Sequence, residues 1–130
     1  MTREEVIKNE HFPTEYEDNL KILLERINKL QSLHPTFKFI ITSGFRSIET
    51  HLRIYKEKGI TDKNKIPMKS KHLTCQAVDI ADAKFFLTNW CKENEEVLKE
   101  IGLWCEDDVT VKRLHLQIVP PASGKRWFKP

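Results

Sequence analysis

Three residues in the second half of the chain have side chains of the kinds that bind divalent metals. His72 precedes a short apolar run, Asp79 lies inside that run, and His115 lies inside a later one. A lone carboxylate within Ala-Val-Asp-Ile-Ala is costly to bury without a partner or a metal. Two histidines and one carboxylate make the three-ligand set of a catalytic zinc site, with one position left for water. Zinc lowers the pKa of that water toward neutrality and polarises a scissile carbonyl.

Each of these residues also has a structural interpretation that the sequence leaves open. Asp79 could cap the helix that follows it or pair with a lysine. His115 shares one face of its strand with Gln117, and a single histidine in an apolar strand is more often an ordinary core or surface residue. The metal interpretation therefore depends on whether the three residues meet in space.

Two further groups could take part in hydrolysis. Arg46 comes just after an apolar run, where an arginine can grip a carboxylate or carbonyl oxygen in a cleft. The acidic cluster Glu106, Asp107 and Asp108 could supply the general base that a zinc peptidase needs to take a proton from water. Taken alone, the arginine is better explained by a solvated turn and the acids by a charged hairpin.

The elements that must position these residues follow from the spacing of the apolar residues. Helical spacing predicts helices over 16–33, 48–58 and 83–101. Runs of β-branched and aromatic residues predict strands over 37–43, 77–81, 103–106 and 114–119. The last two strands lie too close together for a crossover, so they should pair antiparallel. We therefore predict an α+β fold with a central, mainly antiparallel sheet and helices packed against it.

Composition indicates one globular domain. The 130 residues, 39% hydrophobic and 32% charged, supply enough apolar material for one core. We expect a single domain over 1–130, with an N-terminal arm over 1–14 and a C-terminal tail over 120–130. A net charge of +3 is too small to argue for nucleic acid, and no apolar run approaches the length of a membrane span. We expect a monomer that does not insert into membranes.

Cysteine use and the first residues of the chain give expectations about its compartment. Three cysteines without a CxxC spacing argue against a disulfide framework and for a reducing compartment. The first residues lack the apolar stretch of a secretion signal. We therefore expect a protein that is cytoplasmic as synthesised.

Together these segments resemble the zinc D-Ala-D-Ala carboxypeptidase family, which includes the vancomycin-resistance D,D-carboxypeptidases and the phage L-alanyl-D-glutamate endopeptidases. The resemblance covers roughly residues 20–127 and depends on Ser-Gly-Phe-Arg-Ser, on Ser-x-His-x(6)-Asp and on a late strand histidine. It implies a hedgehog/D,D-peptidase-like domain and one zinc ion held by His72, Asp79 and His115. It also implies that Arg46 stabilises the substrate carbonyl as charge develops on it.

Three more residues are expected near the substrate. Ser43 and Ser70 match positions of the family motifs and are expected to shape the site through hydrogen bonds. Gln117 shares a strand face with the last histidine. We predict that all three contribute to substrate binding.

Two positions depart from the family pattern. Cys75 stands where the family usually has glycine, so a positive φ angle would strain it; it could also be a soft metal ligand, an oxidation-sensitive thiol or a packed residue. Lys112 stands three residues before the last histidine, where many members have a catalytic acid. Some members instead carry a glutamate at the end of the preceding strand, and Glu106 fits that alternative. Glu106 is therefore the candidate general base.

The resemblance implies a zinc metallopeptidase that hydrolyses a peptide bond in peptidoglycan stem peptides or cross-links, as a carboxypeptidase or an endopeptidase. One alternative, favoured by Lys112, is a catalytically impaired relative that binds cell-wall peptides or another protein. Another is a structural component of a phage particle or secretion machine. Because a phage lysis enzyme needs no secretion signal, we expect a phage or prophage origin and action on the wall after release.

Overall fold

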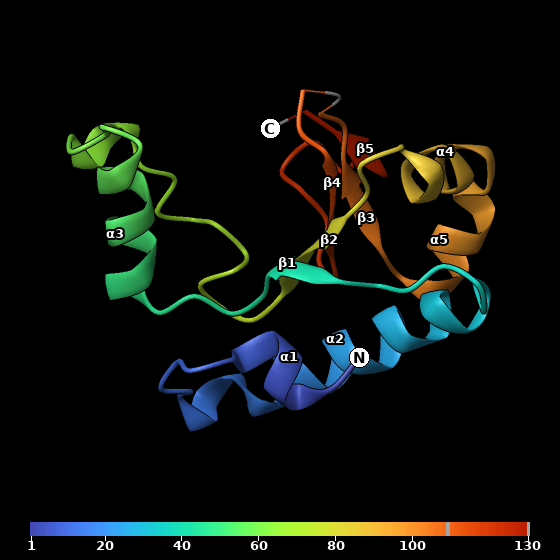
Figure 1. Cartoon of the computed structure of the whole chain (residues 1–130), viewed down its shortest axis with the longest axis horizontal. Coiled ribbons are helices and arrows are strands. Elements are labelled where there is room, and N and C mark those ends of the chain that lie inside the picture. The colour runs from blue at the N-terminus through green and yellow to red at the C-terminus, as the bar shows by residue number, and fades with distance from the viewer. Residues whose placement is uncertain (109, 130) are drawn as a thin grey trace.

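A computed structural model describes residues 1–108 and 110–129, and within them it has one five-stranded sheet with helices around it (Figure 1). The α-helices are α1 (Arg3–Ile7), α2 (Glu17–Ser32), α3 (Ile48–Glu57), α4 (Phe86–Glu93) and α5 (Glu95–Ile101). The strands are β1 (Ile41–Ser43), β2 (Ala77–Ala81), β3 (Trp104–Glu106), β4 (Arg113–Gln117) and β5 (Trp127–Phe128). Two short 3-10 turns are η1 (Thr14–Tyr16) and η2 (Lys63–Lys65). The predicted α+β class is confirmed.

The strands follow the order β1-β2-β4-β3-β5 across the sheet. The pairs β1–β2, β2–β4 and β3–β4 are antiparallel, and the short pair β3–β5 is parallel. The expected antiparallel pairing of the strands around 103–106 and 114–119 is therefore confirmed. In the central pair, Asp79 of β2 lies directly opposite His115 of β4. The register of this pair decides which side chains meet.

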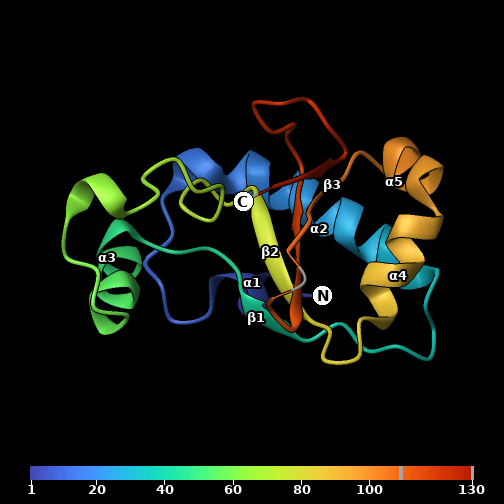
Figure 2. The same ribbon diagram turned by 90° about the horizontal axis from the view of Figure 1, so that it is seen from above.

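The two faces of the sheet have different roles because side chains alternate along a strand. Val78 and Ile80 of β2, and Leu114 and Leu116 of β4, belong to the buried core together with leucines and isoleucines of α2. Helices α4 and α5 lie at one end of the molecule and α3 at the other, and α2 runs below the sheet in the view of Figure 1 (Figures 1 and 2). A slip of one residue would turn the core residues to the opposite face, so burial of these aliphatic side chains fixes the register.

The expected N-terminal arm contains a helix that supports the turn after β1. Thr2 and Glu5 form a capping box at the start of α1. Val6 is buried, and its carbonyl oxygen accepts a hydrogen bond from the Phe45 N–H at 2.9 Å. A Cβ atom at Gly44 would overlap that same carbonyl oxygen. Glycine is therefore required here by the close approach of α1 to the Ser-Gly-Phe-Arg-Ser turn.

Two predicted elements differ from those observed. The long helix expected over 83–101 is two helices, because Asn94 leaves helical geometry and its side-chain amide donates to the Trp90 carbonyl at 2.8 Å. Such side chains compete with the backbone for helical hydrogen bonds. The strand expected over 37–43 shortens to β1, since β2 pairs with Ile41 and Ser43. Among the described residues, no helix is long and apolar enough to cross a membrane.

Candidate metal centre

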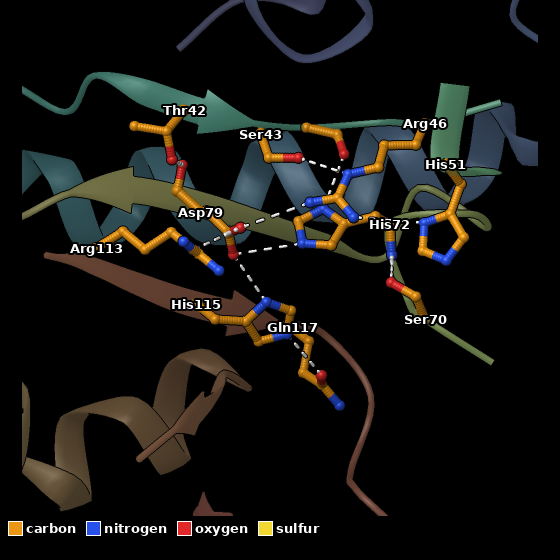
Figure 3. A network of polar contacts seen from close by, with 11 residues as sticks. Thr42, Ser43, Arg46, His51, Ser70, His72, Asp79, Arg113, His115 and Gln117 are labelled. Atoms are coloured by element: carbon orange, nitrogen blue, oxygen red, sulfur yellow. Dashed lines mark hydrogen bonds and ion pairs between the residues drawn. The ribbon is translucent and has the colours of Figure 1, made fainter. Parts of the chain in front are cut away.

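The three predicted ligands converge at the centre of the sheet (Figure 3). Asp79 and His115 face each other from β2 and β4, and His72 comes from the segment that leads into β2. The Asp79 Oδ1 atom lies 2.9 Å from His115 Nδ1 and 3.3 Å from His72 Nε2. One ligand atom from each residue lies within 4.8 Å of the others. This largely buried group could hold a metal ion.

The second nitrogen of each imidazole is occupied by a hydrogen-bond acceptor. His72 Nδ1 lies 2.8 Å from the Gly44 carbonyl oxygen, so that nitrogen donates and Nε2 faces Asp79. His115 Nε2 lies 2.9 Å from Gln117 Oε1. The Gln117 amide nitrogen donates to the Val119 carbonyl at 2.9 Å, which fixes the amide with its oxygen toward His115. Outer hydrogen bonds of this kind orient metal ligands and select their tautomers.

The same contacts set the protonation of the cluster. Burial alone would raise the pKa of Asp79, but its hydrogen bonds to the two histidines hold that pKa below its usual value. Burial lowers the pKa of His72. Burial also opposes the charging of His115, yet its hydrogen bond to Asp79 and the charge of that carboxylate give a raised pKa overall. A proton and a metal ion therefore compete for His115 Nδ1.

The predicted arginine and serines lie beside the ligands. Arg46 follows β1, and its Nε–H donates to Ser43 Oγ at 2.9 Å. Its terminal Nη2 lies 4.0 Å from Asp79 Oδ2. Ser70 Oγ accepts a hydrogen bond from the His72 backbone N–H at 3.4 Å. Both serines thus hold a site residue in place, and direct contact between either serine and a substrate stays a prediction.

Arg113 belongs to the site although its sequence context did not single it out. Its Nε lies 3.2 Å from Asp79 Oδ2. The two oxygens of Asp79 are therefore divided, with Oδ1 toward the histidines and Oδ2 toward the arginines. The register of β4 is the signal that could have found Arg113, because it shares a strand face with His115.

A cavity of about 440 Å³ opens over this cluster. Residues that line it come from the turn after β1, α3, the segment 67–72, the sheet and the chain end, and they include Arg46, Tyr55, Lys71, Glu106 and Phe128.

The predicted base lines this cavity. Glu106 ends β3, and burial raises its pKa; the Asp79 charge adds to this effect, whereas the nearby His115 opposes it. A carboxyl group whose pKa lies above its usual range is better suited to exchange protons near neutral pH. Asp107 is paired instead with Lys92 at 3.2 Å and with Lys129 at 3.4 Å.

The two departures from the family pattern occupy different surroundings. Lys112 is exposed, and its backbone oxygen accepts from the Asp82 N–H at 3.0 Å. Cys75 is fully buried in the core with a φ of 58°, so the expected strain at this position is present. Burial raises the pKa of its thiol to about 12. Among the described residues, the candidate metal group contains no cysteine, which leaves Cys75 as a packed residue.

The donor set decides which ions the site can accept. Two imidazole nitrogens and one carboxylate oxygen suit zinc and neighbouring transition metals. Ligand atoms at about 2.0–2.1 Å from a tetrahedral ion lie about 3.4 Å apart, and the separations from Asp79 Oδ1 to the two nitrogens are 2.9 and 3.3 Å. Both separations are close to this value, and the two imidazole nitrogens lie within 4.8 Å of each other, so the donor set is compatible with a tetrahedral ion. Comparisons with protein-family models, with curated proteins and with solved structures find no match for this chain.

Proposed function

We propose that this chain is a zinc-dependent peptidase that hydrolyses a peptide bond in bacterial peptidoglycan stem peptides or cross-links. The observation that carries the proposal is the convergence of His72 Nε2, Asp79 Oδ1 and His115 Nδ1 beneath an open cavity. This ligand set is typical of catalytic zinc sites, which leave a further position open. The motifs that resemble the zinc D-Ala-D-Ala carboxypeptidase family support the choice of substrate.

His72, Asp79 and His115 would hold the zinc ion, which would supply a Lewis acid and lower the pKa of water so that the nucleophilic hydroxide forms near neutral pH. Glu106 accepts the proton of the attacking water and delivers it to the nitrogen that leaves. Arg46 donates N–H groups to the carbonyl oxygen as negative charge develops there. A C–O bond forms as the C–N bond breaks, so the products are one new carboxylate and one new amine.

The cavity also supports a short, extended ligand. Its volume of about 440 Å³ falls within the range of about 300–1,000 Å³ that small-molecule sites commonly have. The residues that line the cavity carry both signs of charge, with Lys69 and Lys71 from the segment before β2 and Glu106 and Asp108 from the end of β3 and the residues after it. A peptide segment with a carboxylate and an amine suits such a lining.

The proposal is tested by metal content and by peptide release. We expect one zinc per chain after purification with zinc, and new amino groups when the loaded protein is incubated with purified peptidoglycan. Zinc without any released amino groups or peptides would favour a non-catalytic wall-binding module. A chain that folds but takes up no zinc would contradict the metal centre itself.

A pair of variants tests the assignment of the base. Glu106→Gln removes the proton acceptor and should lower kcat by about 10²–10⁴-fold, the usual contribution of general acid–base catalysis. Asp108→Asn is the matched control, because Asp108 lines the same cavity but is hydrogen-bonded to Thr110. We expect this control to retain activity. Activity that survives in Glu106→Gln would show that another group accepts the proton.

A further inference from the structure

His51 is a fully buried histidine that the chemistry described above does not use. It lies on α3, where it is the one buried residue of the helix. Its ring lies beside Arg46, on the side away from His115 (Figure 3). Because a buried imidazole without hydrogen-bond partners is costly, the contacts of its two nitrogens need an explanation.

Both nitrogens of His51 have a partner, and the two partners have opposite character. Nε2 lies 3.0 Å from the Pro67 carbonyl oxygen, and Nδ1 lies 3.4 Å from Arg46 Nη1. A carbonyl can only accept a hydrogen bond, and a guanidinium can only donate one. The neutral tautomer with its proton on Nε2 satisfies both at once. Burial also lowers the pKa of His51, which favours this neutral form.

The contact with His51 holds one edge of the Arg46 guanidinium. Ser43 Oγ accepts from Nε at 2.9 Å, and the Arg46 backbone N–H donates to the His72 carbonyl at 3.1 Å. At the far end, Nη2 lies 4.0 Å from Asp79, which is beyond hydrogen-bond distance. Ser43 alone would leave the guanidinium free to turn about the last bonds of its side chain. His51 supplies the second fixed point that sets its plane.

Arg113 competes with Arg46 for Asp79, which makes the contact between His51 and the Arg46 guanidinium more important. Asp79 Oδ2, which is the oxygen nearest to Arg46, lies 3.2 Å from Arg113 Nε. That carboxylate oxygen is therefore already engaged by a closer arginine. The attraction of Asp79 cannot by itself fix the direction in which Arg46 presents its remaining N–H groups.

We propose that His51 is a positioning residue that accepts a hydrogen bond from Arg46 and so aims its guanidinium into the cavity beside the metal ligands. The same ring ties the Pro67 carbonyl, and thus the segment before Ser70, to α3. The proposed orientation of Arg46 follows from the contacts of His51 and Ser43 with its side chain and does not depend on the proposed function. Its catalytic consequence rests on the proposed function.

Two substitutions separate hydrogen bonding from packing. His51→Leu keeps apolar bulk and removes both polar contacts. His51→Gln carries an acceptor and a donor on one amide, as the imidazole does, and should restore both contacts. The readout is the exchange with water of the Arg46 Nη–H protons, which include the one that faces His51 Nδ1, measured by ¹⁵N NMR on the full chain with a chelator present. Arg46→Lys assigns the resonance, and exposed Arg53 on the same helix is an internal control.

We expect His51→Leu to speed exchange of the Arg46 Nη–H protons about tenfold, as loss of one hydrogen bond to a charged group allows. His51→Gln should return the rate to within about twofold of wild type. The Arg53 signal should not change. Unchanged Arg46 exchange in a folded His51→Leu, or failure of His51→Gln to restore it, would overturn the inference.

If His51→Leu does not fold, His51→Ser serves in its place, because the smaller side chain leaves room for water at the Pro67 carbonyl. It cannot reach Arg46, so the same faster exchange is expected, and an unchanged rate again contradicts the inference.

Turnover on peptidoglycan gives the second readout. His51→Leu should lower kcat about tenfold with little change in KM, because the lost contact acts through Arg46 in the transition state. His51→Gln should recover kcat. A wild-type chain without turnover would contradict the proposed function, whereas the exchange rates would still decide the role of His51.

Discussion

His34 and His72 are two histidines that are almost fully buried, with exposed fractions of 6% and 4%, and their surroundings differ. Both ring nitrogens of His72 have polar neighbours, the Gly44 carbonyl at 2.8 Å and Asp79 at 3.3 Å. The ring of His34 instead packs edge-on against Trp90, with centroids 4.3 Å apart. Its Nε2 is buried without a hydrogen-bond partner in the described part of the chain.

The two rings also differ in the charges beside them, because only His72 lies near a carboxylate. The pKa of His34 is lowered by burial. The pKa of His72 is also lowered by burial, but there the carboxylate of Asp79 pulls in the opposite direction. A buried histidine therefore indicates a site when its neighbours present a charge and further ligand atoms. Where its neighbours are aromatic rings, it contributes to packing.

The largest effect should follow from removing one ligand. His72→Ala deletes one of three metal donors and should weaken zinc binding by more than about 100-fold, which exceeds the range typical of outer contacts. His34→Ala is the matched control and should leave zinc affinity unchanged, although it removes a packed ring and lowers the free energy of unfolding. Competition with a chromophoric chelator measures both affinities. Equal zinc affinity in the two variants would show that His72 is no more a zinc ligand than His34 is.

A smaller effect on zinc binding should follow from removing an outer hydrogen bond. Gln117→Leu leaves the three ligands in place but takes away the acceptor that holds the His115 Nε2–H at 2.9 Å. We expect zinc affinity to fall about 10–100-fold, the usual cost of losing such a contact. Gln117→Glu keeps an acceptor at this position and should bind zinc at least as well as wild type. If Gln117→Leu binds zinc normally, Asp79 alone orients His115.

The helices and strands that the sequence predicted well are those with a long or regular apolar pattern. Six leucines and isoleucines at helical spacing predicted the helix over 16–33, and α2 spans Glu17–Ser32. The strand expected over 77–81 coincides with β2. The two short elements α1 and β5 were not predicted. They have five and two residues, too few for a periodic pattern, and they depend on contacts with distant segments.

The metal ligands could be predicted because they stand in recognisable motifs. The residues around them could be predicted less well, because their places depend on how strands pair and how helices pack. The three candidate ligands were identified from their motifs, and the structure brings them together. Arg113 and His51 were missed because their roles depend on where neighbouring strands and helices place them. The pairing of β2 with β4 puts Arg113 beside Asp79, and the path of α3 puts His51 beside Arg46. The spacing of two residues puts Arg113 on the same strand face as His115, but its contact with Asp79, and that of His51 with Arg46, depend on how distant segments pack.

The smallest effect concerns His34 and the dependence of stability on pH. The ordinary pKa of a histidine is about 6.5, and burial lowers that of His34 in the folded chain. As the pH falls through about 6.5, the unfolded chain binds a proton that the folded chain does not bind until the pH is lower. The folded state then binds fewer protons than the unfolded state, so stability decreases as the pH falls.

Replacing the ring isolates this contribution. His34→Phe keeps an aromatic side chain against Trp90 and removes the titrating group. The free energy of unfolding, measured with urea in the presence of a chelator from pH 7 to pH 5, should decrease more steeply in wild type than in His34→Phe. The difference in slope cannot exceed about 1.4 kcal/mol per pH unit for one proton. Because both chains keep His72, Asp79 and His115, the titration of that cluster cancels in the comparison. Parallel curves would mean that His34 has an ordinary pKa, and that its buried Nε2 accepts a proton as readily as a solvated one.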